Sequence, residues 1–284
     1  MRWEDFRPSE NVEDRRGMGP AAVGGGLGVG GLVIVGLLSL FFGVDPRVIM
    51  NMAPGGSPAQ RQEQVAPGTP QDEAGRFVSA VLGQTEDTWT EIFGQSGRRY
   101  EKPRLVMFRG STQSGCGHAK AQMGPFYCPL DKKVYIDLSF FDEMRRRFRV
   151  QGDFAAAYVI AHEVGHHVQN LLGILPKVHE EQRRMDKAEA NRMSVRVELQ
   201  ADCLAGLWAN RAEQAKRFLE RGDVEEAINA ASAIGDDKLQ QQSQGYVVPD
   251  AFTHGSSKQR VHWFMTGFRS GRLDACNTFR AEVF

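Results

Sequence analysis

The pattern of hydrophobic and polar residues contains one long uncharged and mostly apolar run, residues 21–44. These 24 positions include no Asp, Glu, Lys or Arg. As a helix, such a run is long enough to cross a bilayer core of about 30 Å. A cleaved signal peptide is the alternative, but the run exceeds a usual signal core and no clear small-x-small cleavage site follows it. We therefore expect residues 21–44 to form a single, uncleaved N-terminal transmembrane helix.

Arginines are more frequent before this run than after it. Four precede it in residues 1–20, whereas only Arg47 and Arg61 follow nearby. Positively charged residues collect on the cytoplasmic side of membrane spans. We expect a single-pass protein of the bacterial inner (plasma) membrane, with residues 1–20 in the cytoplasm and the C-terminal part in the periplasm.

The chain after the apolar run changes character twice. Residues 45–70 are rich in Pro, Gly and Gln and lack apolar periodicity, which is typical of a flexible linker. Residues 71–284 show the periodicities of a folded domain. Helical spacing covers 72–93, 153–173, 181–218, 224–242 and 256–270, and strands are expected at 104–108 and 133–138. The predicted fold class is α+β, a mostly helical domain with a small β-sheet.

The charge balance excludes one class of partner. Lys plus Arg and Asp plus Glu both number 35, so the formal net charge is zero. Nucleic-acid-binding domains show a clustered basic excess. The short arginine runs here, such as Arg145 to Arg147, have acidic residues close by and are typical of solvated helix faces. We expect no nucleic-acid partner.

Four cysteines, an even number, follow the apolar run: Cys116, Cys128, Cys203 and Cys276. An even number is what disulfides in an oxidising compartment require. Three pairings are possible, and we favour a local bridge between Cys116 and Cys128 with a second between Cys203 and Cys276. Four buried free thiols are the alternative. A zinc site built from cysteines is disfavoured because no C-x-x-C pair occurs.

The sequence H-E-V-G-H lies within the helix expected from Asp153. His162 and His166 are four residues apart, so their imidazoles share one helix face and suit a tetrahedral Zn²⁺. Glu163 follows the first histidine and can accept a proton from water beside the metal. A polar helix face with surface histidines is the alternative, but the apolar neighbours Tyr158 to Ile160 and Val164 indicate a buried setting.

A catalytic zinc requires a third protein ligand and an open fourth position. Glu198 is our candidate, with Asp202 one helical turn later on the same face. Asp202 would accept the free N–H of a metal-binding histidine and so orient its ring. An isolated E-x-x-x-D is more often an exposed helix face. The surrounding residues, Leu199, Ala201 and Cys203 among them, make this helix apolar instead.

The remaining histidines are assigned by their surroundings. His254 stands in a loop before a helix, and we propose it as a donor to the oxyanion that forms when a carbonyl is attacked. Tyr135 and Tyr158 are weaker candidates for that role. His167, next to the second ligand, and His262, beside Trp263, are interpreted as structural or surface residues. His118 and His179 lie in polar surroundings and are expected to be exposed.

Four separated blocks resemble the bacterial family of putative neutral zinc metallopeptidases. These blocks are HEVGHHVQ, SVRVELQADCLAGLWA, GCGHAKAQMGPFYCPLDKKVYIDLSFF and THGSSKQRVHWFMTGF. The resemblance extends to the first residues and to the apolar run. It implies a zincin-like domain of the gluzincin type with one Zn²⁺, in which His162, His166 and Glu198 are ligands and Glu163 is the general base. It also places His254 near the site.

The hypothesis is a membrane-anchored zinc peptidase that hydrolyses peptide bonds at the cell envelope. Its partner would be a peptide or protein substrate, which the strand at 133–138 could pair with. Two alternatives stay open. The domain could be a non-catalytic envelope module in which zinc braces the helices, or a metal-dependent amidase acting on cell-wall material.

Overall fold

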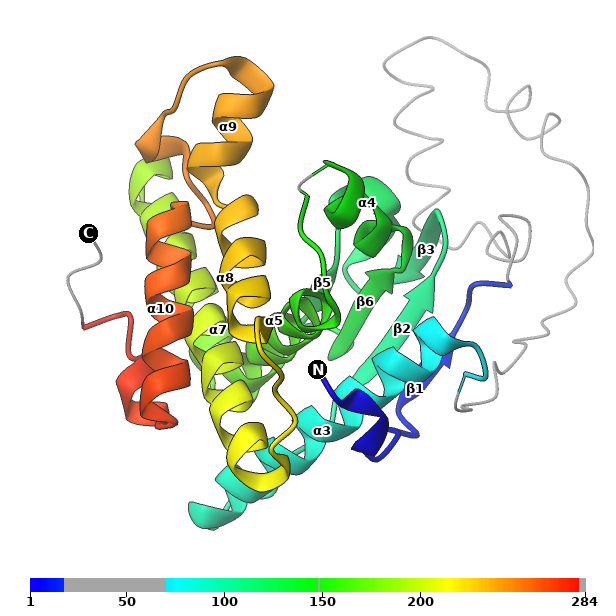
Figure 1. Cartoon of the computed structure of the whole chain (residues 1–284). Helices are drawn as coiled ribbons and strands as arrows, with labels where there is room; N and C mark the ends of the chain where they lie inside the picture. Colours follow the sequence, from blue (N-terminus) through cyan, green and yellow to red (C-terminus); the bar gives the residue numbers. More distant parts are fainter. Residues whose placement is uncertain (18–69, 148, 281–284) are drawn as a thin grey trace, which may run out of the picture. The chain divides into compact units, whose positions relative to one another are not determined.

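The computed structural model describes residues 1–17, 70–147 and 149–280 (Figure 1). Its α-helices are α3 (Glu73–Gln95), α4 (Ser139–Arg147), α5 (Asp153–Leu171), α6 (Ile174–Gln182), α7 (Lys187–Lys216), α8 (Asp223–Ala233), α9 (Asp236–Gln244) and α10 (Ser257–Ser270). Its strands are β1 (Val12–Asp14), β2 (Arg104–Phe108), β3 (Ser111–Ser114), β4 (Gly117–Lys120), β5 (Phe126–Cys128) and β6 (Lys133–Asp137). Short 3₁₀ helices are η1 (Trp3–Asp5), η3 (Ala121–Met123), η4 (Pro249–Ala251) and η5 (Leu273–Cys276).

The larger sheet has the strand order β1-β2-β6-β5. Strand β1 is parallel to β2, and β2 is parallel to β6, with Val106 opposite Tyr135. Strand β5 runs antiparallel to β6 and forms one edge of the sheet. Strands β3 and β4 form a separate antiparallel hairpin. The expected substrate-pairing strand, 133–138, corresponds to β6. It has a partner on each side, so its backbone is not free to bind a peptide.

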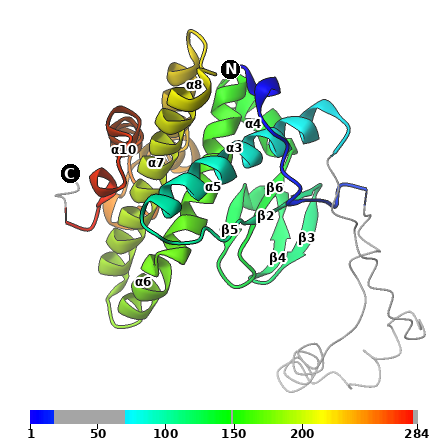
Figure 2. The same ribbon diagram turned by 90° about the horizontal axis from the view of Figure 1, so that it is seen from below.

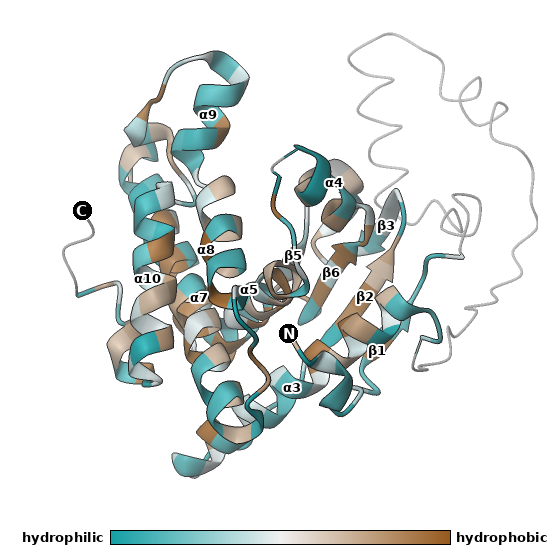
Figure 3. Ribbon diagram, viewed as in Figure 1, coloured by the Kyte–Doolittle hydropathy of each residue, from teal (hydrophilic) through white to brown (hydrophobic). Residues whose placement is uncertain are grey.

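Helix α5 is the centre of the domain. The sheet and α3 lie on one side of it, and α7, α8 and α10 lie on the other (Figures 1 and 2). One hydrophobic core joins these layers, with Val81 of α3, Leu105 of β2, Ile160 of α5, Leu204 of α7 and Phe264 of α10 all buried. Hydrophobic residues therefore gather on β2 and β6, whereas α9 is mostly hydrophilic (Figure 3). This arrangement explains why the sequence of α5 is apolar around its histidines.

The first 17 residues are part of this domain. Strand β1 pairs with β2 through Val12 and Leu105, and Val12 is fully buried. On α3, the buried Glu86 accepts hydrogen bonds from Ser9 Oγ at 2.5 Å and Asn11 Nδ2 at 2.7 Å. These contacts hold residues 1–17 in one compact unit with the described chain after residue 69.

The predicted fold class, α+β with a single N-terminal transmembrane helix before the domain, is wrong. The sheet is mixed and its first three strands are parallel, so the fold is of mixed α/β type. Strand β1 precedes the predicted membrane helix and β2 follows it. Hydrogen-bonded strands lie on one side of a bilayer, whereas a single crossing between them would separate them. The predicted helix 21–44 and nearly all of the linker 45–70 lie outside the described residues. Within those residues, every helix is too short or too polar to traverse a bilayer.

The predicted helices and strands of the domain are otherwise present, but two predicted helices are interrupted. Of the helix expected at 181–218, residues 181–182 belong to α6 and the main part begins at Lys187 as α7. The helix expected at 224–242 is divided into α8 and α9 around Gly235. A Cβ at Gly235 would lie 2.4 Å from the backbone nitrogen of Ser257, so this close approach requires glycine. Pro176 lies in the first turn of α6, where a missing N–H costs little.

Candidate metal centre

Helix α5 brings the H-E-V-G-H segment to its closest neighbour, α7. Ile160 and Val164 are fully buried and hold α5 in the core. Gly165, between the two histidines, allows the helices to approach. A Cβ there would lie 3.1 Å from the carbonyl oxygen of Ala201 on α7, which is tighter than most Cβ contacts. The two helices are therefore close enough to share ligands.

The side chains of His162, His166 and Glu198 meet at one point. Nε2 of His162 lies 3.2 Å from Glu198 Oε2, and Nε2 of His166 lies 3.5 Å from Glu198 Oε1. One ligand atom from each residue lies within 4.8 Å of the other two. The structure thus brings together the three residues that the sequence predicted as ligands.

This donor set fits a zinc ion. Two imidazole nitrogens and a carboxylate oxygen are common Zn²⁺ ligands, and three protein ligands leave one position open. Burial alone would raise the pKa of Glu198, but the neighbouring His166 and His162 hold it well below its usual value. Glu198 is therefore a carboxylate, the form that binds metal.

Asp202 orients the first histidine. Nδ1–H of His162 donates to Asp202 Oδ1 at 2.8 Å, so Nε2 is the nitrogen that faces Glu198 and is left to bind a metal. Asp202 is fully buried. The positive charge of Arg260 lowers the pKa of Asp202 against the effect of burial. The sequence predicted this carboxylate and its partner.

Arg260 of α10 was not predicted. Its Nε donates to Asp202 Oδ2 and its Nη2 to Asp202 Oδ1, both at 2.9 Å, and both side chains are almost completely buried. The hydroxyl of Tyr158 also donates to Asp202. The available sequence signal was an arginine on the same helix face as Trp263 and Phe264, which follow Arg260 by three and four residues. A buried charge there requires an acidic partner.

Gln169 orients the second histidine. Nδ1–H of His166 donates to Gln169 Oε1 at 2.9 Å, which again leaves Nε2 facing Glu198. Gln169 is fully buried and lies three residues after His166, on the same face of α5. Its role was not predicted from the sequence. The i, i+3 spacing of a glutamine after a ligand histidine was the signal.

Glu163 lies beside the ligands and lines the same cavity. Its side chain is buried. Burial raises the pKa of Glu163, although His162 and His166 act in the opposite direction. A carboxylate with a raised pKa accepts and returns a proton more readily at neutral pH. This position suits the role of general base that the sequence predicted.

His254 lines the cavity from the loop before α10, with about half of its side chain exposed. Asp236, which the sequence analysis missed, holds this loop. Its Oδ2 accepts the backbone N–H groups of Thr253 at 2.7 Å, His254 at 2.6 Å and Gly255 at 3.0 Å. The hydrogen bond from Nδ1 of His254 to Asp236 raises the pKa of His254. The structure therefore places this predicted residue at the cavity.

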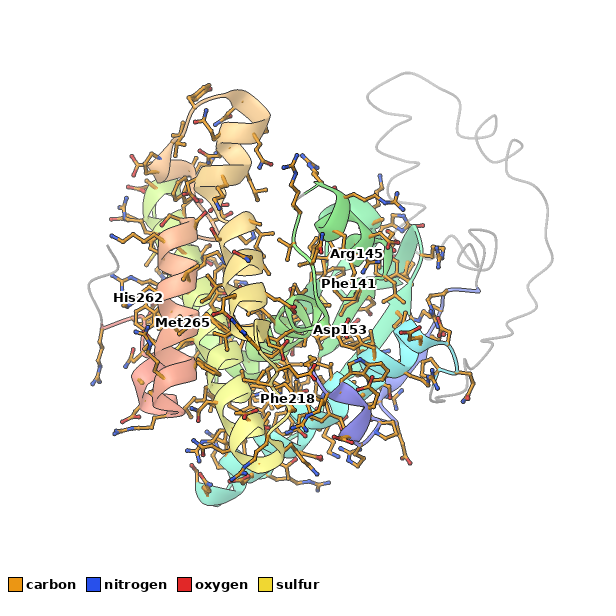
Figure 4. The ribbon with its side chains drawn as sticks, viewed as in Figure 1. Phe141, Arg145, Asp153, Phe218, His262 and Met265 are labelled. Atoms are coloured by element: carbon orange, nitrogen blue, oxygen red, sulfur yellow. A yellow bond between two sulfur atoms is a disulfide. The ribbon has the colours of Figure 1, made fainter. Side chains whose placement is uncertain are left out.

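The other histidines lie outside the ligand set. His167 is buried; it accepts from the Tyr127 hydroxyl at 3.0 Å and donates to the Glu101 carbonyl at 2.6 Å. Burial lowers the pKa of His167 to about 4, so it is a neutral structural residue. His262 is exposed on the outer side of α10 (Figure 4). His118 and His179 are exposed as expected, but His179 also lines the cavity.

The cavity around the ligands has a volume of about 600 Å³. Beside the ligands it is lined by aliphatic and aromatic side chains from β5, α6 and α7, including Phe126, Tyr127, Leu175, Val178 and Val197. Tyr135 is not among the lining residues; its hydroxyl donates to Asp131 at 2.6 Å. Polar side chains, among them Glu143, Gln182 and Arg260, also line the cavity. A cavity that combines apolar walls with convergent polar groups is typical of a ligand-binding site.

The domain contains two disulfides, with the pairing that the sequence predicted. Cys116 is bonded to Cys128, and this bridge ties the end of β5 to the β3–β4 hairpin. Cys203 is bonded to Cys276, which ties α7 to η5. The described residues contain no free cysteine.

Comparison with known proteins gives a family and relatives along nearly the whole chain. Residues 1–279 match the family model described as "Putative neutral zinc metallopeptidase". The chain is 54% identical over 292 residues to the uncharacterized protein YpfJ of Escherichia coli K12. That alignment covers 100% of this chain and 100% of the relative. It is 38% identical over 259 residues to the uncharacterized protein Rv2575 of Mycobacterium tuberculosis H37Rv, covering 86% of this chain and 85% of the relative. No solved structure matches the chain.

Proposed function

Since this chain belongs to the family of putative neutral zinc metallopeptidases, we propose that it is a zinc-dependent peptidase that hydrolyses peptide bonds. The convergence of His162, His166 and Glu198 at a cavity that also contains Glu163 carries this proposal. A zinc that only braces helices needs four protein ligands and no nearby base. Here three ligands converge beside a carboxylate, which is the pattern of a catalytic site.

The metal would be held by Nε2 of His162, Nε2 of His166 and the carboxylate of Glu198. When bound, zinc polarises a substrate carbonyl and lowers the pKa of water in the open position. The chain supplies the orientation. Asp202 and Gln169 hold the two imidazoles by their Nδ1–H groups, so both Nε2 lone pairs point to one place.

Proton transfer is assigned to Glu163. Its carboxylate takes a proton from the attacking water and returns it to the leaving amine. This role suits a carboxyl group whose burial raises its pKa towards the working pH. His254 is the proposed donor to the oxyanion of the substrate. Its raised pKa favours the cationic form of the imidazole, which donates the stronger hydrogen bond.

The substrate is proposed to bind as an extended chain along β5. This strand is an edge of the sheet, and Phe126 and Tyr127 line the cavity. An edge strand offers unpaired N–H and C=O groups, to which a peptide can add as a further strand. We therefore propose β5, in place of the expected strand β6, as the strand that pairs with the substrate.

The proposed location of the domain is the cell envelope, outside the cytoplasm. Two disulfides support this, because disulfides persist in oxidising compartments. Residues 1–17 belong to the same compact unit as the metal centre, so the proposal places them in the same compartment.

Glu163→Gln tests the proposed function. The variant removes the base but leaves the ligands, so it should bind zinc like the wild type and lose activity by about 10²–10⁴-fold. Zinc content is measured by metal analysis, and cleavage with a peptide library. A zinc-loaded Glu163→Gln protein with full activity would contradict the assigned role. Hydrolysis of cell-wall fractions without peptide cleavage would favour the amidase, and zinc binding without either activity would favour the binding module.

A further inference from the structure

Two buried glutamines join the metal centre to a disulfide. Gln169 is fully buried and Gln200 is 7% exposed. Gln169 Nε2 donates to Gln200 Oε1 at 3.0 Å and to the Val197 carbonyl at 2.7 Å. Gln200 Nε2 donates to the Cys276 carbonyl at 2.9 Å. Together these contacts form a chain from His166 to Cys276, which we call the amide relay.

Two backbone carbonyls fix the direction of the amide relay. A carbonyl oxygen only accepts hydrogen bonds, so Cys276 requires the NH₂ group of Gln200. The Oε1 of Gln200 then faces Gln169, whose NH₂ group must point to Gln200 and Val197. That arrangement leaves Oε1 of Gln169 towards His166. Because an amide oxygen is an acceptor, Nδ1 of His166 must carry a proton, which leaves Nε2 as the nitrogen available to a metal.

The relay spans both helices that supply metal ligands. It begins on α5 with His166 and Gln169 and continues on α7 with Gln200, two residues after Glu198. It ends at Cys276 of η5, and a disulfide links Cys276 to Cys203 of α7. The end of the relay is therefore covalently attached to the helix that carries Glu198.

We infer that Gln169 and Gln200 are positioning residues for zinc, and that the Cys203–Cys276 disulfide supports zinc binding by anchoring their relay. This inference rests on the metal site of the proposed function. It assigns the disulfide a role beyond holding the fold, since breaking it frees the backbone acceptor that sets the direction of the relay. Loss of direction lets the His166 ring rotate or change its protonated nitrogen.

Methionine substitutions test the relay, because they keep the side-chain volume and remove the hydrogen bonds. Gln169→Met should raise the zinc dissociation constant by about 10–100-fold, as for other groups that orient a ligand histidine. Gln200→Met acts through Gln169 and should raise it less, by about threefold or more. The measurement is competition with a chromophoric chelator on the purified full chain. The visible spectrum of the Co²⁺-loaded protein reports ligand geometry independently.

Gln84→Met is the matched control. Gln84 is a buried glutamine of α3, 3% exposed, whose Oε1 has no hydrogen-bond partner among the described residues. Its replacement should leave zinc affinity and the Co²⁺ spectrum unchanged. Equal loss in the Gln84 and Gln200 variants would show a general packing effect and would overturn the inference.

The two disulfides provide a second matched pair. Cys203→Ala with Cys276→Ala should raise the zinc dissociation constant by about threefold or more, whereas Cys116→Ala with Cys128→Ala should not change it. If the first double variant does not fold, the comparison of Gln200→Met with Gln84→Met decides alone. A Gln200→Met protein with wild-type zinc affinity and Co²⁺ spectrum overturns the inference. A wild-type chain that binds no zinc contradicts the proposed function instead.

Discussion

The two histidines that face Glu198 are held by surroundings of different kinds. His162 donates to Asp202, a buried carboxylate paired with the guanidinium of Arg260. His166 donates to Gln169, a neutral amide at the start of the amide relay. Both arrangements produce the same result, an Nε2 atom directed at the metal position. They differ in how much the free energy of unfolding falls when one of the interacting residues is replaced.

A buried ion pair depends on both of its charges. Removing one partner leaves the other charge buried without compensation, which is strongly destabilising. A neutral amide leaves only an unsatisfied hydrogen-bonding group, and the penalty is smaller. The fold and the metal site should thus be tightly coupled on the His162 side and more separable on the His166 side.

Asp202→Ala should have the largest effect. It leaves the buried guanidinium of Arg260 without its carboxylate partner, so the free energy of unfolding of the metal-free protein should fall by about 3–5 kcal/mol. Zinc affinity should fall by about 10–100-fold because His162 loses its acceptor. Denaturant titration and chelator competition measure the two quantities. The control is Asp274→Ala, in an exposed pair with Arg272, which should change neither. An Asp202→Ala protein as stable as the wild type would remove the distinction between the two surroundings.

Arg260→Met added to Asp202→Ala should restore part of the lost stability. The double variant no longer contains an unpaired buried charge, and replacing a buried ion pair with apolar residues is often tolerated. Zinc affinity should stay low, because His162 still lacks its acceptor. A double-mutant cycle gives the coupling, expected at about 0.5–3 kcal/mol. Recovery of zinc affinity together with stability would show that Asp202 acts on the metal only through the fold.

Gln169→Met should cost less stability than Asp202→Ala. The change leaves the Val197 carbonyl and Gln200 Oε1 without their donor, for which about 1–3 kcal/mol is expected. Denaturant titration of the metal-free protein measures it. If Gln169→Met lowered stability as much as Asp202→Ala, the separability of the His166 side would be refuted.

Replacement of His254 should have the smallest effect on zinc affinity, but it should change the pH dependence of kcat/KM. The hydrogen bond to Asp236 and the charges of Glu198 and Asp236 raise its pKa, while burial and Arg260 oppose this. The cation is present below the raised pKa and is lost as the pH rises through it. The contribution of His254 to kcat/KM should accordingly disappear on the alkaline side. His254→Gln should remove this alkaline decrease in kcat/KM and leave zinc affinity unchanged. Asp236→Asn should shift the alkaline decrease to lower pH. An unchanged pH profile in His254→Gln would exclude His254 as the donor.

The parts of this site that the sequence predicted share a local origin. His162 and His166 converge because residues four apart on a helix always share a face. Glu198 and Asp202 were identified because carboxylates in an apolar helix require a cation. Arg260 is 58 residues from Asp202, and only tertiary packing brings them together. No spacing rule connects positions so far apart.

Two other features were missed for different physical reasons. Strand β1 has three residues, too few to show a period of two. Strand β1 also precedes the apolar run 21–44. Because that run was predicted to be a membrane helix, the folded domain was predicted to begin only after it, at residue 71. The amide relay escaped notice because glutamines are usually exposed, and burial becomes visible only in the fold.

The pairing of β1 with β2 also determines the order in which the fold can be completed. Val12 is synthesised early, but its partner Leu105 comes much later. The segment made first is therefore among the last to be placed, because this contact needs a long loop to close. A chain interrupted before β2 would display Val12 and Phe6, both buried in the finished domain, without a partner. Such an incomplete chain would expose apolar residues that chaperones and proteases recognise.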